Sequence, residues 1–554
     1  MTTKQNHLKS TIMIKTIHFS FTKSLCVLLV TLAFSLKVSA NVHHEYLIVR
    51  GFEYEITYDD QDWNGTASAS LIRRVWNIET GEEYTIQYEE WNTDSVYAIP
   101  STIDDCPVTS ICGGFYGCSD IKTIIIPPTV TKIERGVFAN SSLESICFMY
   151  DGHGIPINFA VPVPNPYDEE GIDYSCLSVS AGEFSNCKRL KTVEFQRPIN
   201  KFPVGMFLNC SKLENVYFNP YYVNPNDISM DTIEPCAFFG CEGLTHFEMP
   251  KSVKVIGEGA FAHCHDLETI DISAVTSIDD FAFAVCYQLK DVTLNPSLNY
   301  LGEAAFLKCE SLTSMSIPDS ITTIRERTFY GCHNLADLNL NNVTTLCERS
   351  FVGCNSLTEL DLTKARSIGE AAFFAGYANC GVSIDQYGGP SYVSIGSWEE
   401  GGGVIEKYGS LKRITLGENV TLLNDRTFVG HVPDTITCWA PAPPIFSRTD
   451  IYSMTFNPQA YDSTVLRVPQ VLVNEYREAF CWNQFVNIEG MTVIGNGDVN
   501  GDGQLTISDV AAFIDMLLNG QSGVANPINA DVNGDGSLSI GDITKLIDHL
   551  LNGN

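Results

Sequence analysis

A phenylalanine recurs along this chain at a nearly constant interval, and this recurrence limits the possible folds more than any other feature. Most steps between neighbouring copies are 22 or 23 residues. In nine units a cysteine follows three residues after the phenylalanine, and an apolar residue, usually leucine, lies three residues further on. Units this short cannot bury their own apolar side chains, so they must stack on their neighbours to form one core. The phenylalanines are Phe115, Phe138, Phe184, Phe207, Phe238, Phe261, Phe283, Phe306, Phe329, Phe351 and Phe373.

Each unit also carries the pattern Leu-x-x-Ile-x-Ile or a close variant, as in the segments that begin at Leu267 and Leu357. The alternation of apolar side chains predicts one short strand per unit, followed by a return segment to the next unit. We therefore predict an α/β repeat solenoid of leucine-rich repeats over residues 105–490, with short parallel strands on one face.

The full unit, Ile-x-x-x-Ala-Phe-x-x-Cys-x-x-Leu-x-x-Ile-x-Ile-Pro, resembles the BspA-like family of bacterial surface leucine-rich repeats. Two units depart from it, because Ser141 and Gly376 stand where the cysteine is expected. The resemblance implies an adhesion or recognition protein. Three stretches interrupt the pattern and predict protruding loops, near residues 151–172, 220–229 and 377–408.

The segments before the repeats have a different character. Residues 41–104 contain alternating stretches rich in tyrosine and tryptophan, which predict an N-terminal β cap. Residues 1–40 hold lysines, an apolar run and the small-residue pattern Val38-Ser39-Ala40, which are typical of a secretory signal peptide. We therefore expect a secreted protein, extracellular or associated with the cell surface. Since no second apolar run is long enough, we expect no membrane span.

The composition is strongly acidic, with a formal net charge of -32. Such a chain repels the phosphates of nucleic acids and anionic lipids, so we expect no nucleic-acid partner. The charge suits divalent cations or basic partners instead.

The repeated cysteines could serve metal or redox chemistry, or they could be buried thiols that hydrogen-bond to neighbouring backbone. Stacked side chains that all point one way have poor disulfide geometry, so the buried arrangement is favoured. Cys106 and Cys112 lie outside this series and could form a disulfide.

Outward-facing residues of the predicted strands form polar rows on the concave side of the solenoid. A solenoid offers a long surface without a pocket, which suits a protein partner. An ordinary solvated surface would have the same composition. The candidate partner-binding residues are Glu194, Tyr217, Glu248, Asp271, Asp337, Glu359 and Asp361.

Near the C-terminus, a twelve-residue calcium-loop pattern occurs twice, 33 residues apart. It places oxygen ligands at loop positions 1, 3, 5, 7, 9 and 12 and a glycine at position 6. We therefore predict two calcium ions. The candidate ligands are Asp498, Asn500, Asp502, Gln504, Thr506 and Asp509 in the first loop, and Asp531, Asn533, Asp535, Ser537, Ser539 and Asp542 in the second.

Each loop runs into an amphipathic helix, and the duplicated loop and helix over residues 496–554 resemble a type I dockerin module. The resemblance implies a small α-helical, calcium-dependent domain that docks to a cohesin-like receptor. Loop positions 10 and 11 help to select that receptor in dockerins, and here they differ from the familiar Ser/Thr pairs. The corresponding residues are Ile507, Ser508, Ile540 and Gly541.

We find no zinc-protease helix, nucleophile elbow or phosphate-binding loop, so we expect no catalytic residues and no enzyme. Our first hypothesis is an adhesion protein whose solenoid binds a partner while the tail docks it to a receptor. The alternative is a non-catalytic accessory subunit of an extracellular polysaccharide-degrading complex, of the cellulosome kind. A third hypothesis places catalysis in the loop near residues 377–408.

Overall fold

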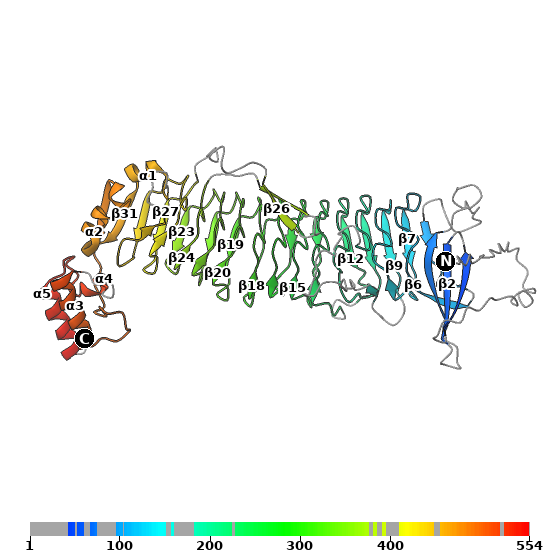
Figure 1. Cartoon of the computed structure of the whole chain (residues 1–554), viewed down its shortest axis with the longest axis horizontal. Coiled ribbons are helices and arrows are strands. Elements are labelled where there is room, and N and C mark those ends of the chain that lie inside the picture. The colour runs from blue at the N-terminus through cyan, green and yellow to red at the C-terminus, as the bar shows by residue number, and fades with distance from the viewer. Residues whose placement is uncertain are drawn as a thin grey trace, which may run out of the picture.

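The computed structural model describes residues 42–49, 52–59, 67–74, 96–103, 105–150, 157–159, 182–223, 228–375, 380–384, 390–394, 409–447, 455–520 and 526–552. Within these residues the repeats stack into an elongated solenoid, and a small helical module follows at its C-terminal end (Figure 1). The predicted signal peptide and most of the loops near 151–172 and 377–408 lie outside the described residues. The part of the last loop that is described forms an antiparallel hairpin, β25 (Cys380–Ile384) and β26 (Pro390–Ser394).

Each predicted Leu-x-x-Ile-x-Ile segment contributes to a ladder of short strands along one side of the solenoid. Neighbouring strands are parallel and in register, so Glu194 pairs with both Cys147 and Tyr217. Apolar residues such as Val193 point into the core, and we call the opposite, outward surface the strand face. Its strands are β4 (Val96–Ala98), β7 (Thr123–Ile126), β9 (Ser145–Phe148), β11 (Thr192–Phe195), β12 (Asn215–Phe218), β14 (His246–Phe247), β16 (Thr269–Ile270), β19 (Ser314–Ser316), β21 (Asp337–Asn339), β23 (Glu359–Leu362), β27 (Arg413–Leu416), β29 (Thr435–Cys438), β31 (Val465–Pro469) and β32 (Asn487–Met491).

A second parallel ladder runs where the sequence predicts only a return segment. Each of its strands in the central repeats has two residues, too few for a periodic pattern to be recognised. The repeats are thus a parallel-strand solenoid of the leucine-rich type, which confirms the predicted fold. These strands are β13 (Thr232–Ile233), β15 (Val255–Ile256), β17 (Ser277–Ile278), β18 (Tyr300–Leu301), β20 (Thr323–Ile324), β22 (Thr345–Leu346), β24 (Ser367–Ile368), β28 (Leu422–Leu423) and β30 (Ile445–Phe446).

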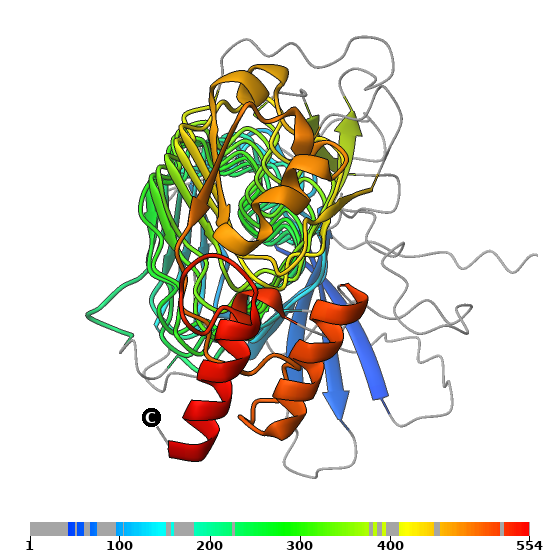
Figure 2. The same ribbon diagram turned by 90° about the vertical axis from the view of Figure 1, so that its left-hand side faces the viewer.

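The repeated phenylalanines form one column in the core. From Phe115 to Phe373, neighbouring ring centroids lie 4.9–5.7 Å apart with interplanar angles of at most 27°. The column continues through Phe428 and Phe456, which the sequence pattern does not predict. In the end-on view of Figure 2 the successive repeats lie behind one another as coils.

The turn that carries each phenylalanine is held by backbone hydrogen bonds to the next repeat. Phe261 N–H donates to the carbonyl of Ala282, and His263 N–H donates to that of Ala284. Residues two before and two after the phenylalanine adopt positive φ, as Gly259 and His263 do at 59°. The later position is usually glycine or asparagine, the residues that tolerate this conformation best.

The buried thiols form a ladder that locks each repeat to the one before it. Cys286 Sγ donates to the carbonyl oxygen of Phe261 over 3.2 Å, and Cys309 Sγ makes the same bond to Phe283 over 3.3 Å. Burial raises the pKa of the Cys286 thiol to about 12, so the group stays protonated. The prediction of buried, hydrogen-bonded thiols is confirmed. The suggested disulfide between Cys106 and Cys112 is wrong, because neither residue is disulfide-bonded.

A histidine replaces cysteine in one rung of this ladder. His431 lies three residues after Phe428, and its Nε2–H donates to the carbonyl oxygen of Phe373 over 2.8 Å. The pattern search missed this repeat because the loop near residues 377–408 breaks the spacing and the cysteine is absent. Burial lowers the pKa of His431 to about 4.

The two ends of the solenoid are covered differently. At the N-terminal end, β1 (Val42–Val49), β2 (Phe52–Asp59) and β3 (Ala67–Arg74) form an antiparallel meander. Strand β3 then pairs in parallel with β6 of the second ladder, which covers a sheet edge that would otherwise be open. The remaining strands of this sheet are β5 (Thr102–Ile103), β6 (Cys106–Ile111), β8 (Lys132–Ile133) and β10 (Asn158–Phe159).

At the C-terminal end, the buried side chain of Trp482 closes the aromatic core. Its ring lies 5.9 Å from Phe456, and its Nε1–H donates to the carbonyl oxygen of Pro444 over 2.7 Å. In the described residues, helices occur only from Pro458 onward. They are α1 (Pro458–Ser463), the 3-10 turn η4 (Gln470–Leu472), α2 (Val473–Glu478), the 3-10 turn η5 (Trp482–Gln484), α3 (Ile507–Asn519), α4 (Pro527–Ala530) and α5 (Ile540–Asn552).

We expect Phe306→Ala to destabilise the solenoid by about 3–5 kcal/mol, because it removes a ring stacked on both sides and leaves a cavity. Urea unfolding followed by circular dichroism measures this cost. Phe306→Leu keeps most of the volume and should cost clearly less. An Ala variant that unfolds within about 1 kcal/mol of the wild type would contradict the role of the column.

We expect His431 to make the solenoid less stable in acid. Its folded pKa of about 4 lies below the unfolded value of about 6.5, so the unfolded chain takes up the proton first. The contribution is complete above the unfolded pKa and is lost as the pH falls through the folded pKa. His431→Cys, which supplies the thiol of the other rungs, should therefore gain in relative stability between neutral pH and about pH 4. Parallel urea unfolding curves that show a constant difference across this range would refute the prediction.

Candidate functional site

The second calcium loop brings three carboxylates together. Asp531, Asp535 and Asp542 each offer an oxygen, and these atoms all lie within 4.8 Å of one another. Among the described residues this is the one group of three or more His, Cys, Asp or Glu side chains with that proximity. Oxygen donors at this spacing match the preference of Ca²⁺, a hard cation that takes six to eight oxygen ligands.

Glycines shape both loops around the first aspartate. Asp531 accepts backbone N–H bonds from Gly534 and Gly536 at 2.8 and 2.9 Å, and Gly536 has a φ of 80°. Asp498 accepts equivalent bonds from Gly501 and Gly503 at 2.9 and 3.0 Å. The two loops therefore fold alike, as their sequences predict.

The aspartate at loop position 12 joins each loop to the helix that follows. Asp542 is fully buried and accepts hydrogen bonds from the N–H groups of Asn533 and Ser539 at 3.0 and 3.1 Å. In the first loop, Asp509 accepts bonds from Asn500 and Thr506 at 3.1 and 2.8 Å. These backbone hydrogen bonds orient each carboxylate toward the inside of its loop.

The side chains at the other predicted ligand positions continue this arrangement. Asn533 accepts from Asp535 N–H at 2.7 Å, and Asp535 accepts from Ser537 N–H at 2.8 Å. The hydroxyl of Ser539 donates to Asp542 at 3.1 Å, as a position-9 residue close to the ion would. In the first loop, Asn500 accepts from Asp502 N–H, and Asp502 accepts from Gln504 N–H.

The electrostatics of the second loop favour a cation. Burial raises the pKa of Asp531, and the neighbouring charges of Asp542 and Asp535 raise it further. The Ser537 hydroxyl, which hydrogen-bonds to Asp535, lowers the pKa of that exposed carboxyl. Carboxylates that repel one another across a few ångströms are stabilised when a divalent ion lies between them.

The module that carries these loops has its own small core. Phe513 of α3 and Leu546 of α5 are fully buried in it, together with a few other apolar residues. The module contacts the solenoid through α4, where Ile528 packs against the solenoid core, and through Gly536, whose backbone lies against Gln470. The junction is lined by Pro469, Gln470, Val471, Met491, Val493, Ile528 and Asp531.

The remaining surface of the two long helices is unusually apolar. Ile507 and Ile540 are 73% and 76% exposed, and the equivalent residues Leu518 and Leu551 are each 77% exposed. The predicted partner residues Ser508 and Gly541 are exposed beside them. The sequence analysis missed the two leucines. Their signal is that each is an apolar residue on the exposed side of its helix and that the two lie 33 residues apart.

The predicted residues of the strand face are all at the surface, but they do not form one cluster. Tyr217 and Glu194 are partners, whereas Asp271 bonds to the backbone N–H of Ser273. Glu359 forms an ion pair with Arg413 of the next strand. The remaining predicted residues, each exposed, are Glu248, Asp337 and Asp361.

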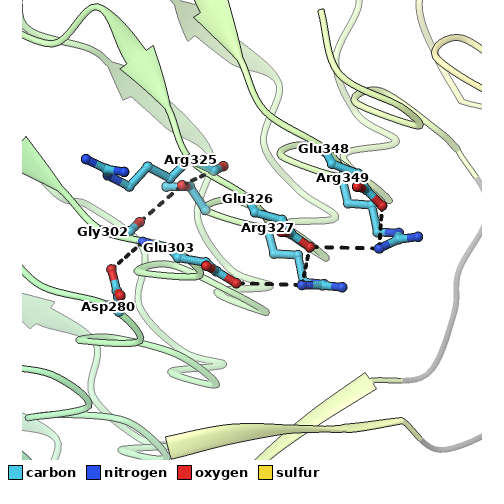
Figure 3. A network of polar contacts seen from close by, with 9 residues as sticks. Asp280, Gly302, Glu303, Arg325, Glu326, Arg327, Glu348 and Arg349 are labelled. Carbon is cyan, nitrogen blue, oxygen red and sulfur yellow. Dashed lines mark hydrogen bonds and ion pairs between the residues drawn. The ribbon is translucent and has the colours of Figure 1, made fainter. Parts of the chain in front are cut away.

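A separate charged row connects neighbouring repeats at the ends of the second-ladder strands (Figure 3). Arg327 lies 3.6 Å from Glu303 of the preceding repeat, and Arg349 lies 3.8 Å from Glu326. Because these groups are partly exposed, each pair adds at most about 1 kcal/mol. The row is better explained by repeat packing than by ligand binding.

We expect Asp542→Asn to weaken calcium binding and the calcium-dependent stabilisation of the module. If free calcium exceeds the dissociation constant about a thousandfold, binding stabilises the fold by about 4 kcal/mol. Removing the buried carboxylate should therefore reduce the increase in Tm that calcium causes, measured on the full chain by calorimetry. Asp548→Asn, an exposed change on α5, is the matched control and should keep the full increase. Equal calcium responses in the two variants would argue against Asp542 as a ligand.

Family models match both the repeats and the C-terminal module. The BspA type leucine rich repeat region matches in six copies, over residues 101–156, 171–268, 223–336 and 267–380. The Dockerin type I domain matches residues 496–551. No curated protein gives a match. Among the described residues, no helix is long and apolar enough to cross a membrane.

Three solved structures are similar to this chain at low identity. A leucine rich cell surface protein from Faecalibacterium prausnitzii A2-165 is 16% identical, with 86% of this chain and 98% of that chain covered and a TM-score of 0.35. The pneumococcal vaccine antigen PcpA is 14% identical, with 81% and 99% covered and a TM-score of 0.36. A leucine-rich repeat protein from Bacteroides ovatus ATCC 8483 is 20% identical, with 58% and 99% covered and a TM-score of 0.29. The chain thus carries BspA-type leucine-rich repeats, followed by a type I dockerin domain.

Proposed function

We propose that this protein is an adhesion or recognition protein, exported to the cell surface or beyond it. Its solenoid binds a protein partner along the strand face, and its dockerin domain docks it to a cohesin-type receptor when calcium is bound. Leucine-rich repeats and dockerin domains are both non-catalytic families, and they supply binding surfaces rather than reacting groups.

The exposed apolar residues of the dockerin domain are the observation that carries the docking role. Ile507 on α3 and Ile540 on α5 occupy equivalent places, and both remain exposed although the module also packs on the solenoid. Large exposed apolar side chains at equivalent places on two helices favour a protein-binding role. The duplication supports two alternative orientations of the receptor, one centred on each helix.

Calcium makes this docking conditional. We propose one ion in each loop, because the two loops share their hydrogen bonds and turns. Among the described residues the module core contains seven buried apolar residues, so the bound ions supply much of its folding energy. Removal of calcium should then disorder α3 and α5 and release the receptor.

The strand face favours a basic protein surface as the partner of the solenoid. Glu248, Asp271, Asp337 and Asp361 are exposed along it, on a chain whose net charge is -32. Complementary charge accelerates encounter and excludes acidic partners, and its effect falls as salt rises.

The dockerin domain also favours a second candidate function. Docking to a shared scaffold would make this chain a non-catalytic accessory subunit of a polysaccharide-degrading complex, with hydrolysis carried out by other chains. Docking itself is common to both functions, so the ligand of the solenoid decides between them.

Capture of purified cohesin modules by the immobilised full chain tests the docking role. We expect capture in calcium and loss of capture in chelator, because the apolar surface requires folded helices. Ile507→Asp combined with Ile540→Asp should abolish capture, whereas either change alone leaves one orientation available. Asp361→Ala, on the strand face, is the control and should not alter docking. Capture that persists in the double variant or in chelator would rule out this mode of docking.

A further inference from the structure

Four tyrosines are exposed on, or just after, two strands of the strand face. They follow or belong to β9 and β12, which flank β11 in the same sheet (Figure 1). We call this group the tyrosine platform: Tyr150, Tyr217, Tyr221 and Tyr222, which are 40%, 37%, 93% and 44% exposed. Exposed aromatic side chains grouped in this way commonly indicate a binding surface.

Two of the four rings are packed against each other, and the backbone that carries Tyr221 and Tyr222 is hydrogen-bonded. The rings of Tyr150 and Tyr222 lie 5.3 Å apart with an interplanar angle of 35°. Tyr222 N–H donates to the carbonyl of Asn219, and Tyr221 N–H donates to the Asn219 side chain, both at 3.0 Å. A rigid aromatic surface loses little conformational entropy on binding, which favours affinity.

A polar centre lies next to the rings. Glu194 Oε1 accepts a hydrogen bond from Asn219 Nδ2 at 2.6 Å and from Gln196 Nε2 at 3.1 Å. Tyr217 lies beside the same carboxylate, and burial together with that negative charge raises the pKa of the tyrosine. The centre thus places one carboxylate, two amides and phenolic hydroxyls beside flat apolar rings.

Aromatic rings beside a carboxylate and amides suit a carbohydrate ligand. The C–H faces of a pyranose ring pack on aromatic rings, and its hydroxyls donate to carboxylates and accept from amides. The carboxylate and the negative charge of the chain oppose anionic ligands. A cationic protein patch would pair with Glu194, but it would make little use of four tyrosines.

The geometry points to the tyrosine platform as a binding site for a neutral glycan chain. The site lies on the solenoid and goes beyond the protein-binding role proposed above. It does not depend on the dockerin domain, so cohesin capture succeeds or fails independently of it.

Isothermal titration of the full chain with cellohexaose, xylohexaose, mannohexaose and maltohexaose tests the site. We expect at least one of these neutral probes to bind, with little change between low and high salt. Loss of one stacked ring weakens binding by about tenfold, so Tyr150→Ala combined with Tyr222→Ala should raise Kd by about a hundredfold. Both residues are exposed, so this variant should keep the wild-type circular dichroism spectrum and Tm.

Tyr116→Ala is the matched control, since Tyr116 is 68% exposed but lies in the turn after Phe115, outside the platform. It should leave the affinity unchanged. The proposal is overturned if none of the four probes binds, if the double variant binds as tightly as the wild type, or if Tyr116→Ala weakens binding equally. Binding that disappears at high salt, or capture of a basic protein without any sugar binding, overturns it as well.

Discussion

The solenoid depends on contacts between repeats rather than on contacts within them. Each phenylalanine ring packs between the rings of the repeats on either side, and each thiol donates to the carbonyl of the preceding phenylalanine. A repeat removed from its neighbours would lose both contacts and leave its ring in water. The strand face is therefore a surface that exists only because many repeats are stacked in register.

The sequence predicted the contacts that recur and missed the residues that vary. The column of phenylalanines, the buried thiols and the parallel strands follow from spacing alone. The second ladder was missed because strands such as Thr323–Ile324 are too short to show a period. His431 was missed because a different side chain supplies the same hydrogen bond at a broken interval.

The candidate sites show the same division. The folding of the two loops could be predicted because metal coordination fixes residue types at fixed positions, and the hydrogen bonds of Asp542 agree with that pattern. Calcium binding by these residues stays a prediction. The tyrosine platform could not be predicted in full. Tyr150 and Tyr222 are 72 residues apart, and their rings meet only because the repeats that carry them are stacked. Tyr221 and Tyr222 also lie in an insertion, where the repeat pattern gives no guidance.

The backbone bonds of the phenylalanine turns all run in one direction, from the N–H groups of one repeat to the carbonyls of the next. Every internal repeat therefore presents the same donors to its successor and the same acceptors to its predecessor. Unequal exchange between repeats in the gene could add or delete whole turns and leave the same backbone hydrogen bonds at every remaining junction. The length of the array can thus drift during evolution without any redesign of the two ends, which alone must satisfy the unpaired groups.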